Sequence, residues 1–156
     1  MEDQVRWLTT QEQASWRAYL RGTRLIATAL DEGLTRHGTR LTEYEILSML
    51  SEAPDGRLRM SALAQLVVQS RSRLTHTATR LERLGWVQRH AVREDRRGVE
   101  LSLTPAGRAK LEELAEVHVS DVRRILIDRL TPEEFEALGH AMTRVVDSID
   151  VTEGDC

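Results

Sequence analysis

The stretch from Ser61 to Leu103 constrains this chain most, because it reads as helix, turn, helix and then a β-hairpin. The second helix is expected between a Ser70 N-cap and Gly85, and it has two contrasting faces at 100° per residue. Its apolar face contains Leu74, Thr77, Ala78, Leu81 and Leu84. Its opposite face contains Ser72, His76, Thr79, Arg80 and Arg83, without a carboxylate. Surface helices ordinarily mix acids and bases. A face of one sign favours an anionic partner rich in hydrogen-bond acceptors, and DNA is the first candidate.

The net charge of −3 conceals an uneven distribution along the chain. Residues 57–97 carry ten arginines and three acids, a net charge of +7, which leaves −10 for the remainder. A basic segment on an acidic body indicates a nucleic-acid partner more strongly than an overall basic composition does.

Length and composition limit the function classes. A chain of 156 residues with 40% hydrophobic and 30% charged residues predicts one globular domain, residues 1–156. No run approaches the roughly 20 apolar residues of a membrane span, and the start lacks a signal-peptide core, so we predict a cytoplasmic protein, nucleoid-associated when bound to DNA. The single cysteine, Cys156, permits no internal disulfide. Nucleophile motifs and phosphate-binding loops are absent, so neither an enzyme nor a cofactor is predicted.

Capping patterns predict where the other elements begin. They are Thr9–Glu12 for a helix to about Leu34, Thr42–Glu45 for one to about Ser51, Ser61 for one to about Val68, Thr104–Pro105 for one to about Leu130, and Thr131–Glu134 for the last helix. A short strand is expected over 57–59. The first and last helices are too apolar to be solvated on their outer faces. We therefore expect a homodimer with dimerisation helices at 9–37 and 105–150, flanking a DNA-binding module at 42–104.

This order of elements resembles the multiple-antibiotic-resistance regulator (MarR) family of bacterial winged-helix repressors. Three stretches carry the likeness: Leu63 to Val87, Glu94-Asp-Arg-Arg97, and Leu101-Ser-Leu-Thr-Pro-Ala-Gly107. The last two together match the family's wing signature, an Asp-x-Arg followed by a strand ending in Leu-Thr and then a Gly. The resemblance covers roughly residues 10–148.

The resemblance implies a mainly α fold with a small β-hairpin wing, a winged helix-turn-helix flanked by N- and C-terminal dimerisation helices. Arg97 would enter the minor groove from the wing tip, and Asp95 would orient it. Without the neighbouring helix, this pair would be read as an ordinary ion pair in a hairpin turn. The recognition helix would contact phosphates or base edges through Ser70, Ser72, Arg73, Thr75, His76, Thr79 and Arg80. Arg73 and Thr75 lie on the flanks of the face, which favours phosphate contacts for them.

Branches of the family suggest three effector types. Some members bind aromatic or phenolic anions between the dimerisation helices and the winged domain, where Trp16, Tyr19, Tyr44, Met49 and His118 would line a pocket here. An interpretation of these five as core residues is at least as well supported. Zinc sensing needs clustered ligands, and no two histidines lie one helical turn apart, so no metal is predicted. Oxidant-sensing members use a cysteine near the N-terminus, whereas Cys156 is at the opposite end.

We therefore predict a dimeric regulator that binds double-stranded DNA at a pseudo-palindromic operator and represses transcription until a small effector releases it. Two alternatives remain: a zinc- or other metal-responsive regulator of the same fold, and a protein-binding winged-helix module without DNA specificity. Salt dependence separates DNA binding from protein binding, because DNA binding weakens steeply with ionic strength.

Overall fold

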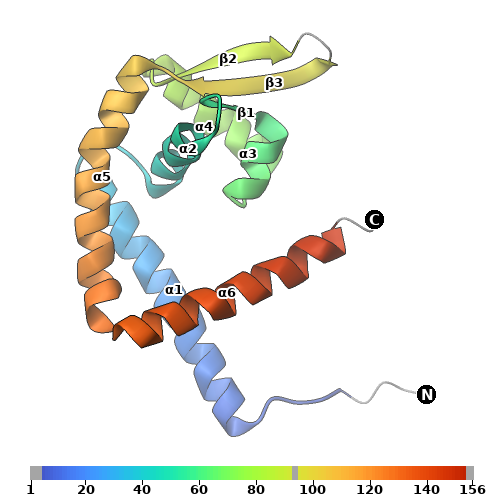
Figure 1. Cartoon of the computed structure of the whole chain (residues 1–156), viewed down its shortest axis with the longest axis vertical. Coiled ribbons are helices and arrows are strands. Elements are labelled where there is room, and N and C mark those ends of the chain that lie inside the picture. Colours follow the sequence, from blue (N-terminus) through green and yellow to red (C-terminus); the bar gives the residue numbers. More distant parts are fainter. Residues whose placement is uncertain (1–4, 93–94, 154–156) are drawn as a thin grey trace. The chain divides into compact units, whose positions relative to one another are not determined.

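The computed structural model describes residues 5–92 and 95–153, and it divides into two compact units, Met1–His118 and Val119–Cys156. Unit 1 contains α1 (Thr10–Thr35), α2 (Leu41–Glu52), β1 (Arg57–Arg59), α3 (Met60–Leu66), α4 (Arg71–Arg83), β2 (Val87–Val92), β3 (Asp95–Leu103) and most of α5 (Pro105–Ile125) (Figure 1). Unit 2 contains the end of α5, the short 3-10 helix η1 (Ile127–Arg129) and α6 (Pro132–Glu153). The mainly helical fold with a small wing is confirmed, while the single-domain assignment stays a prediction.

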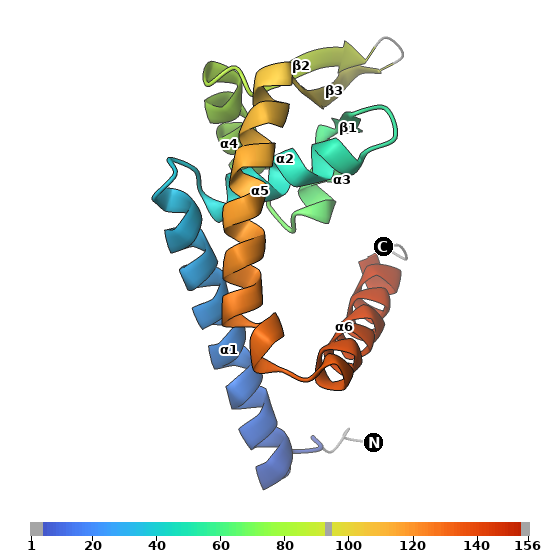
Figure 2. The same ribbon diagram turned by 60° about the vertical axis from the view of Figure 1, so that its left-hand side comes forward.

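The three strands form one antiparallel sheet in the order β1-β3-β2. Leu58 of β1 lies opposite Leu101 of β3, and Val87 of β2 lies opposite Leu103. The register between β2 and β3 shifts at Ala91/Val92, near the hairpin end. Figures 1 and 2 show this hairpin and α4 at the same end of unit 1.

The core of unit 1 lies between this sheet and the helices. Leu63 of α3, Leu81 of α4 and Leu101 of β3 are fully buried together with Leu47 of α2 and Leu114 of α5. Because every element of the helix-turn-helix contributes to one apolar cluster, α4 is held by its neighbours along its inner side.

Most predicted helix starts are confirmed by their hydrogen bonds. Thr9 and Glu12 form a reciprocal capping box, and so do Thr131 and Glu134. The Ser70 Oγ accepts from the Arg73 backbone N–H at 3.3 Å. These side chains satisfy backbone donors that have no partner within their helices.

The predicted starts of α2 and α3 are wrong by a few residues. Helix α2 begins at Leu41, because the Glu43 carboxylate accepts from the Arg40 backbone N–H at 2.9 Å and Asp31 accepts from the Leu41 N–H at 2.8 Å. Thr42 is therefore inside the helix. Helix α3 begins at Met60, directly after strand β1, so Ser61 is not its N-cap.

Two predicted helix ends and one core position also differ. Helix α3 stops at Leu66 because Val68 adopts φ +50°, which no helical residue has. Helix α5 stops at Ile125, where the chain turns into η1. Leu84, predicted on the apolar face of α4, is 42% exposed because the helix ends there and Gly85 (φ +72°) redirects the chain.

The end of α4 is bound tightly to the start of α5. The Thr104 backbone N–H donates to the Trp86 carbonyl at 3.0 Å, and the Thr104 hydroxyl donates to the Gly85 carbonyl at 2.6 Å. A Cβ at Gly107 would lie 2.0 Å from the Trp86 carbonyl oxygen. Only glycine permits this approach, which gives the Leu-Thr-Pro-x-Gly sequence a structural reason.

Candidate nucleic-acid interface

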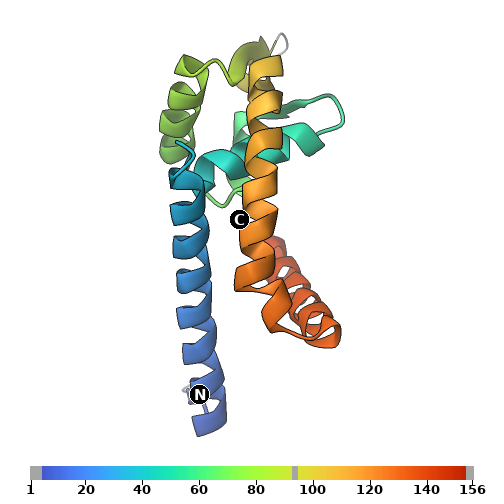
Figure 3. The same ribbon diagram turned by 90° about the vertical axis from the view of Figure 1, so that its left-hand side faces the viewer.

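Helix α4 lies at an edge of unit 1 with one long side uncovered (Figure 3). Leu74, Ala78 and Leu81 are buried on its inner side, as predicted. The predicted contact residues Ser70, Ser72, Arg73, Thr75, His76 and Arg80 are all exposed, and Thr79 is half-buried. The structure therefore brings the residues predicted on α4 together on one accessible surface.

The two threonines of this surface bond to their own helix. The Thr75 hydroxyl donates to the Arg71 carbonyl and the Thr79 hydroxyl donates to the Thr75 carbonyl, each at 2.8 Å. A hydroxyl that has donated backward still has lone pairs that can accept. At Thr79, one lone pair already accepts from Arg89 of β2 at 2.9 Å.

Arg89 connects the wing to α4 through four hydrogen bonds. Its Nη1 donates to the Glu82 carboxylate at 2.7 Å and its backbone N–H to the same carboxylate at 3.3 Å. Its Nη2 donates to the Thr75 carbonyl at 3.1 Å as well as to Thr79. The planar guanidinium thus spans a full turn of α4 and ties strand β2 to it.

Arg80 is bound on the other flank of α4. Its Nε donates to Glu43 of α2 at 2.5 Å, and its Nη2 donates to the Gly38 carbonyl at 3.4 Å. The Glu43 side chain is only 3% exposed, whereas the Arg80 side chain is 53% exposed. Burial of a carboxylate away from water is unfavourable without such a hydrogen-bonded counter-charge.

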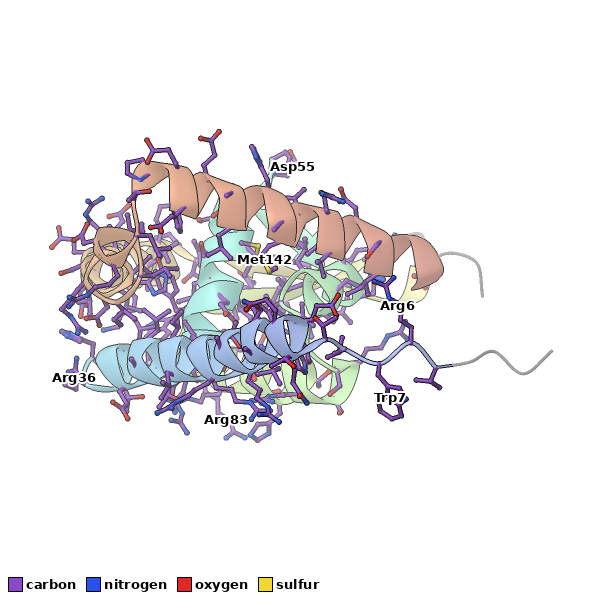
Figure 4. The ribbon with its side chains drawn as sticks, turned by 90° about the horizontal axis from the view of Figure 1, so that it is seen from below. Arg6, Trp7, Arg36, Asp55, Arg83 and Met142 are labelled. Carbon is purple, nitrogen blue, oxygen red and sulfur yellow. The ribbon has the colours of Figure 1, made fainter. Side chains whose placement is uncertain are left out.

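The arginines of the basic segment therefore divide into two groups. Among those with described side chains, Arg59, Arg80 and Arg89 form ion pairs with carboxylates. Four others in the described part have no ion pair: Arg57, Arg71, Arg73 and Arg83. Figure 4 shows Arg83 pointing outward from α4. This second group retains its full positive charge for an anionic partner.

Of the two residues predicted to act together in the wing, Asp95 and Arg97, only Asp95 has a described side chain. Asp95, at the start of β3, accepts from Arg59 of β1 at 3.4 Å, so it is bound to the adjacent strand. The side chain of Arg97 lies outside the described residues, and the orientation of Arg97 by Asp95 stays a prediction. The Arg59–Asp95 pair connects the start of β3 to β1, the strand that precedes α3.

The fold and sequence of the chain are similar to those of solved bacterial regulators. Residues 33–98 match the family model described as MarR family. Sco3205, a MarR family transcriptional regulator from Streptomyces coelicolor solved in complex with DNA, is 41% identical, with 94% of this chain and 92% of that chain covered and a TM-score of 0.88. AbsC, a MarR family transcriptional regulator from the same organism, is 40% identical, with coverage of 94% and 99% and a TM-score of 0.86.

The chain belongs to the MarR family. Among curated proteins, the HTH-type transcriptional regulator PecS of Dickeya dadantii is 34% identical over 104 residues, 65% of this chain. That match spans 62% of the length of PecS. The members of the MarR family that match are transcriptional regulators and not enzymes.

The five residues predicted to line a MarR-type effector pocket fall into separate groups in unit 1. The Trp16 and Tyr19 rings stack at 5.8 Å on α1, where both side chains are exposed. Tyr44 of α2 is buried with its ring 4.3 Å from that of His118 of α5. Met49 packs against the core of the MarR fold. The structure thus brings Tyr44 and His118 together, and burial raises the pKa of the Tyr44 phenol, as the Glu52 charge does to a smaller extent.

Among the described residues of this MarR family member, no group of three or more His, Cys, Asp and Glu side chains is arranged to hold a metal ion. None of the described helices combines the length and apolarity that crossing a membrane requires. Cys156 lies outside the described residues.

Sequence reasoning missed the acids and bases that hold α4 in place. The capping pattern places Glu43 only within a helix start, and no sequence pattern predicts a role for Glu82 or Arg89. Lys110, the only lysine of the chain, donates to the His37 carbonyl at 3.2 Å and lies 5.8 Å from the centre of the Trp86 ring. The sequence contains one indication of the contact to Glu82: it is the only acid within α4, in a helix otherwise rich in arginine.

Proposed function

We propose that this protein is a sequence-specific DNA-binding regulator that represses transcription. The outer surface of α4 is the observation that carries the proposal. It presents Arg73, His76 and Arg83 to solvent, while the nearby carboxylates of Glu43 and Glu82 are each bound to an arginine. An exposed helix with free cations and hydrogen-bonding side chains suits the major groove. The DNA-bound relative Sco3205, 41% identical, supports this assignment.

We further propose that the regulator acts as a homodimer. Apolar side chains remain exposed on α1, as at Leu25, and on α6, as at Val145 and Val146. A second copy that covers them would remove this surface from water. The two α4 helices of such a dimer would be related by a two-fold axis, so the operator would be pseudo-palindromic with half-sites about one turn (~10 bp) apart.

A small aromatic or phenolic effector completes the proposal. The buried Tyr44 phenol beside His118 supports it, because a phenol hydroxyl can donate a hydrogen bond to an anionic effector. An effector that binds beside Tyr44 and His118 in unit 1 would favour a dimer with a different spacing of the two α4 helices. Titration of the DNA complex with phenolic acids tests this step. If none changes the DNA affinity, the effector assignment is wrong.

DNA binding is tested with two duplexes at two salt concentrations. One duplex is the intergenic DNA upstream of the protein's own gene, and the other is a scrambled version of the same composition. We expect tighter binding to the upstream duplex, and the preference should persist at the higher salt concentration. Equal, salt-sensitive binding to both duplexes would indicate an operator elsewhere or an architectural protein. Absence of binding to either would refute the proposed function.

A further inference from the structure

The recognition helix α4 has two kinds of contact with the rest of unit 1. Its inner side packs through Leu74, Ala78 and Leu81, which are apolar and therefore hold it without a strong directional preference. Directional contacts come only from its flanks within the described structure, where Arg80 binds Glu43 and Arg89 binds Glu82. These ion pairs restrict rotation of α4 about its own axis, which the apolar contacts alone restrict less.

Glu43 is placed so that it cannot easily change partners. One carboxylate oxygen accepts from the Arg40 backbone N–H at 2.9 Å, and the other accepts from Arg80. With Arg80 in place the Glu43 side chain is only 3% exposed, so its carboxylate is bound by protein donors and has little contact with water. Movement of Arg80 to a DNA phosphate would leave a buried carboxylate without its counter-charge, which is strongly unfavourable.

Arg80 is also held at a second atom. Its Nη2 donates to the carbonyl of Gly38, in the turn between α1 and α2. Two donors of the Arg80 guanidinium therefore face acceptors outside α4: the Glu43 carboxylate of α2 and the Gly38 carbonyl in the turn before it. This geometry uses the fork of the guanidinium for a contact within the protein.

We propose that Arg80 is a positioning residue: bound to Glu43, it sets the rotation of α4, and thereby which side chains face the bases, without contacting DNA itself. The proposal rests on the proposed DNA-binding function, and it assigns Arg80 a different role from the direct contact expected on the sequence. Arg83, three residues along the same helix and without an ion pair among the described residues, remains a free cation.

The two roles predict different responses to salt. Each phosphate that a protein neutralises contributes about 0.9 to the slope of log affinity against log salt concentration. A cation already neutralised by Glu43 contributes nothing to this slope. A misrotated α4 instead weakens binding to the correct sequence while binding to any other sequence stays the same.

The experiment compares Arg80→Gln, Glu43→Gln and the matched control Arg83→Gln with the wild type. The probes are a duplex that the wild-type protein selects from a random pool and a scrambled duplex, each titrated over a salt series. We expect the first two variants to lower the affinity ratio of selected to scrambled duplex about tenfold. The salt slope should stay unchanged in Arg80→Gln, and it should not fall in Glu43→Gln, where Arg80 loses its counter-charge. The control should lower the slope by about 0.9 per lost phosphate contact and weaken binding to both duplexes together.

Folding is controlled with thermal unfolding and with Arg80→Lys. Lysine keeps a positive charge near Glu43 but lacks the two-donor fork, so the positioning role predicts a lowered affinity ratio at an unchanged salt slope. A direct phosphate contact predicts wild-type values for both quantities. This variant therefore decides the matter even where Arg80→Gln unfolds.

Several outcomes would overturn the inference alone. A salt slope lowered by Arg80→Gln as much as by Arg83→Gln would make Arg80 a phosphate contact. A ratio lowered by Arg80→Gln but unaffected by Glu43→Gln would make it a base contact. Reduced thermal stability with an unchanged ratio would leave only a structural role. A wild-type protein that selects no duplex would refute the proposed function, and the inference with it.

Discussion

The winged module (residues 42–104) and the terminal helices (α1 and α6) differ in how far their large apolar side chains are buried. Leu63, Leu81 and Leu101 of the module are fully buried by contacts within one protomer. Trp16 of α1 is 50% exposed and Val146 of α6 is 53% exposed. The module can therefore form its core alone, whereas the terminal helices have an apolar surface that one protomer does not cover.

The comparison extends to charge. In the winged module, the acids Glu43 and Glu82 serve as internal partners for Arg80 and Arg89. In unit 2, Arg123 pairs with Asp128 and Arg124 with Asp121, with Arg side chains more than half exposed to water. Exposed pairs contribute little to stability, so these two pairs at the end of α5 are expected to add little to the stability of unit 2.

The largest expected effect concerns the junction inside unit 1. Gly107→Ala places a Cβ 2.0 Å from the Trp86 carbonyl oxygen, so the start of α5 and the end of α4 must separate. We expect a loss of about 3–5 kcal/mol in the free energy of unfolding, measured by urea denaturation. Gly139→Ala in α6 is the control: its Cβ meets no atom within 4 Å, and the change should stay within about 1 kcal/mol. Equal effects at both sites would contradict the tight junction.

The second effect tests whether the exposed surface of the terminal helices is covered by a second copy. Val146→Arg should weaken the proposed homodimer by about 2–4 kcal/mol, because an arginine would be buried without a partner. Light scattering or analytical ultracentrifugation would measure the shift toward monomer. Leu66→Arg, at a similarly exposed position (56%) in α3 of the winged module, should leave the mass unchanged. Dissociation by Leu66→Arg would erase the distinction between the two regions.

The third effect concerns the ionic contact between wing and recognition helix. Arg89→Gln removes the bonds of the guanidinium to Glu82, Thr79 and the Thr75 carbonyl. Since both charged side chains are partly exposed, we expect a loss of about 1–2 kcal/mol in unfolding free energy. Arg83→Gln should change that free energy by less than about 0.5 kcal/mol. A comparable loss in Arg83→Gln would mean that the ion pair adds no stability.

The smallest effect is a gain in stability. Val68 lies in the turn of the helix-turn-helix with φ +50°, and its side chain is 89% exposed. A β-branched residue is strained in this region, whereas asparagine tolerates it. Val68→Asn should raise the thermal unfolding midpoint, equivalent to about 0.5–1 kcal/mol. Val68→Ala lacks the amide with which asparagine bonds locally in the left-handed region, so it should gain less. An equal gain would attribute the strain to the β-branch of valine alone.

Sequence alone determined the features that depend on near neighbours. The two faces of α4 follow from residues spaced three and four apart, and its start follows from Ser70 three residues before the N–H that it caps. The hairpin and the Thr104 start of α5 are local in the same sense. The error at Thr42 arose where a distant group intervened: Asp31, ten residues away, accepts from the Leu41 N–H.

Only the tertiary structure decided which arginines of the basic segment are free. A helical wheel places Arg80 and Arg83 on the same face, yet one is bound by a carboxylate 37 residues away and the other is not. Periodicity indicates the direction of a side chain but contains no information about a partner from another element. The charge available for DNA therefore depends on packing between α2, α4 and the sheet. The outer surface of α4 that carries this charge can be predicted from the sequence.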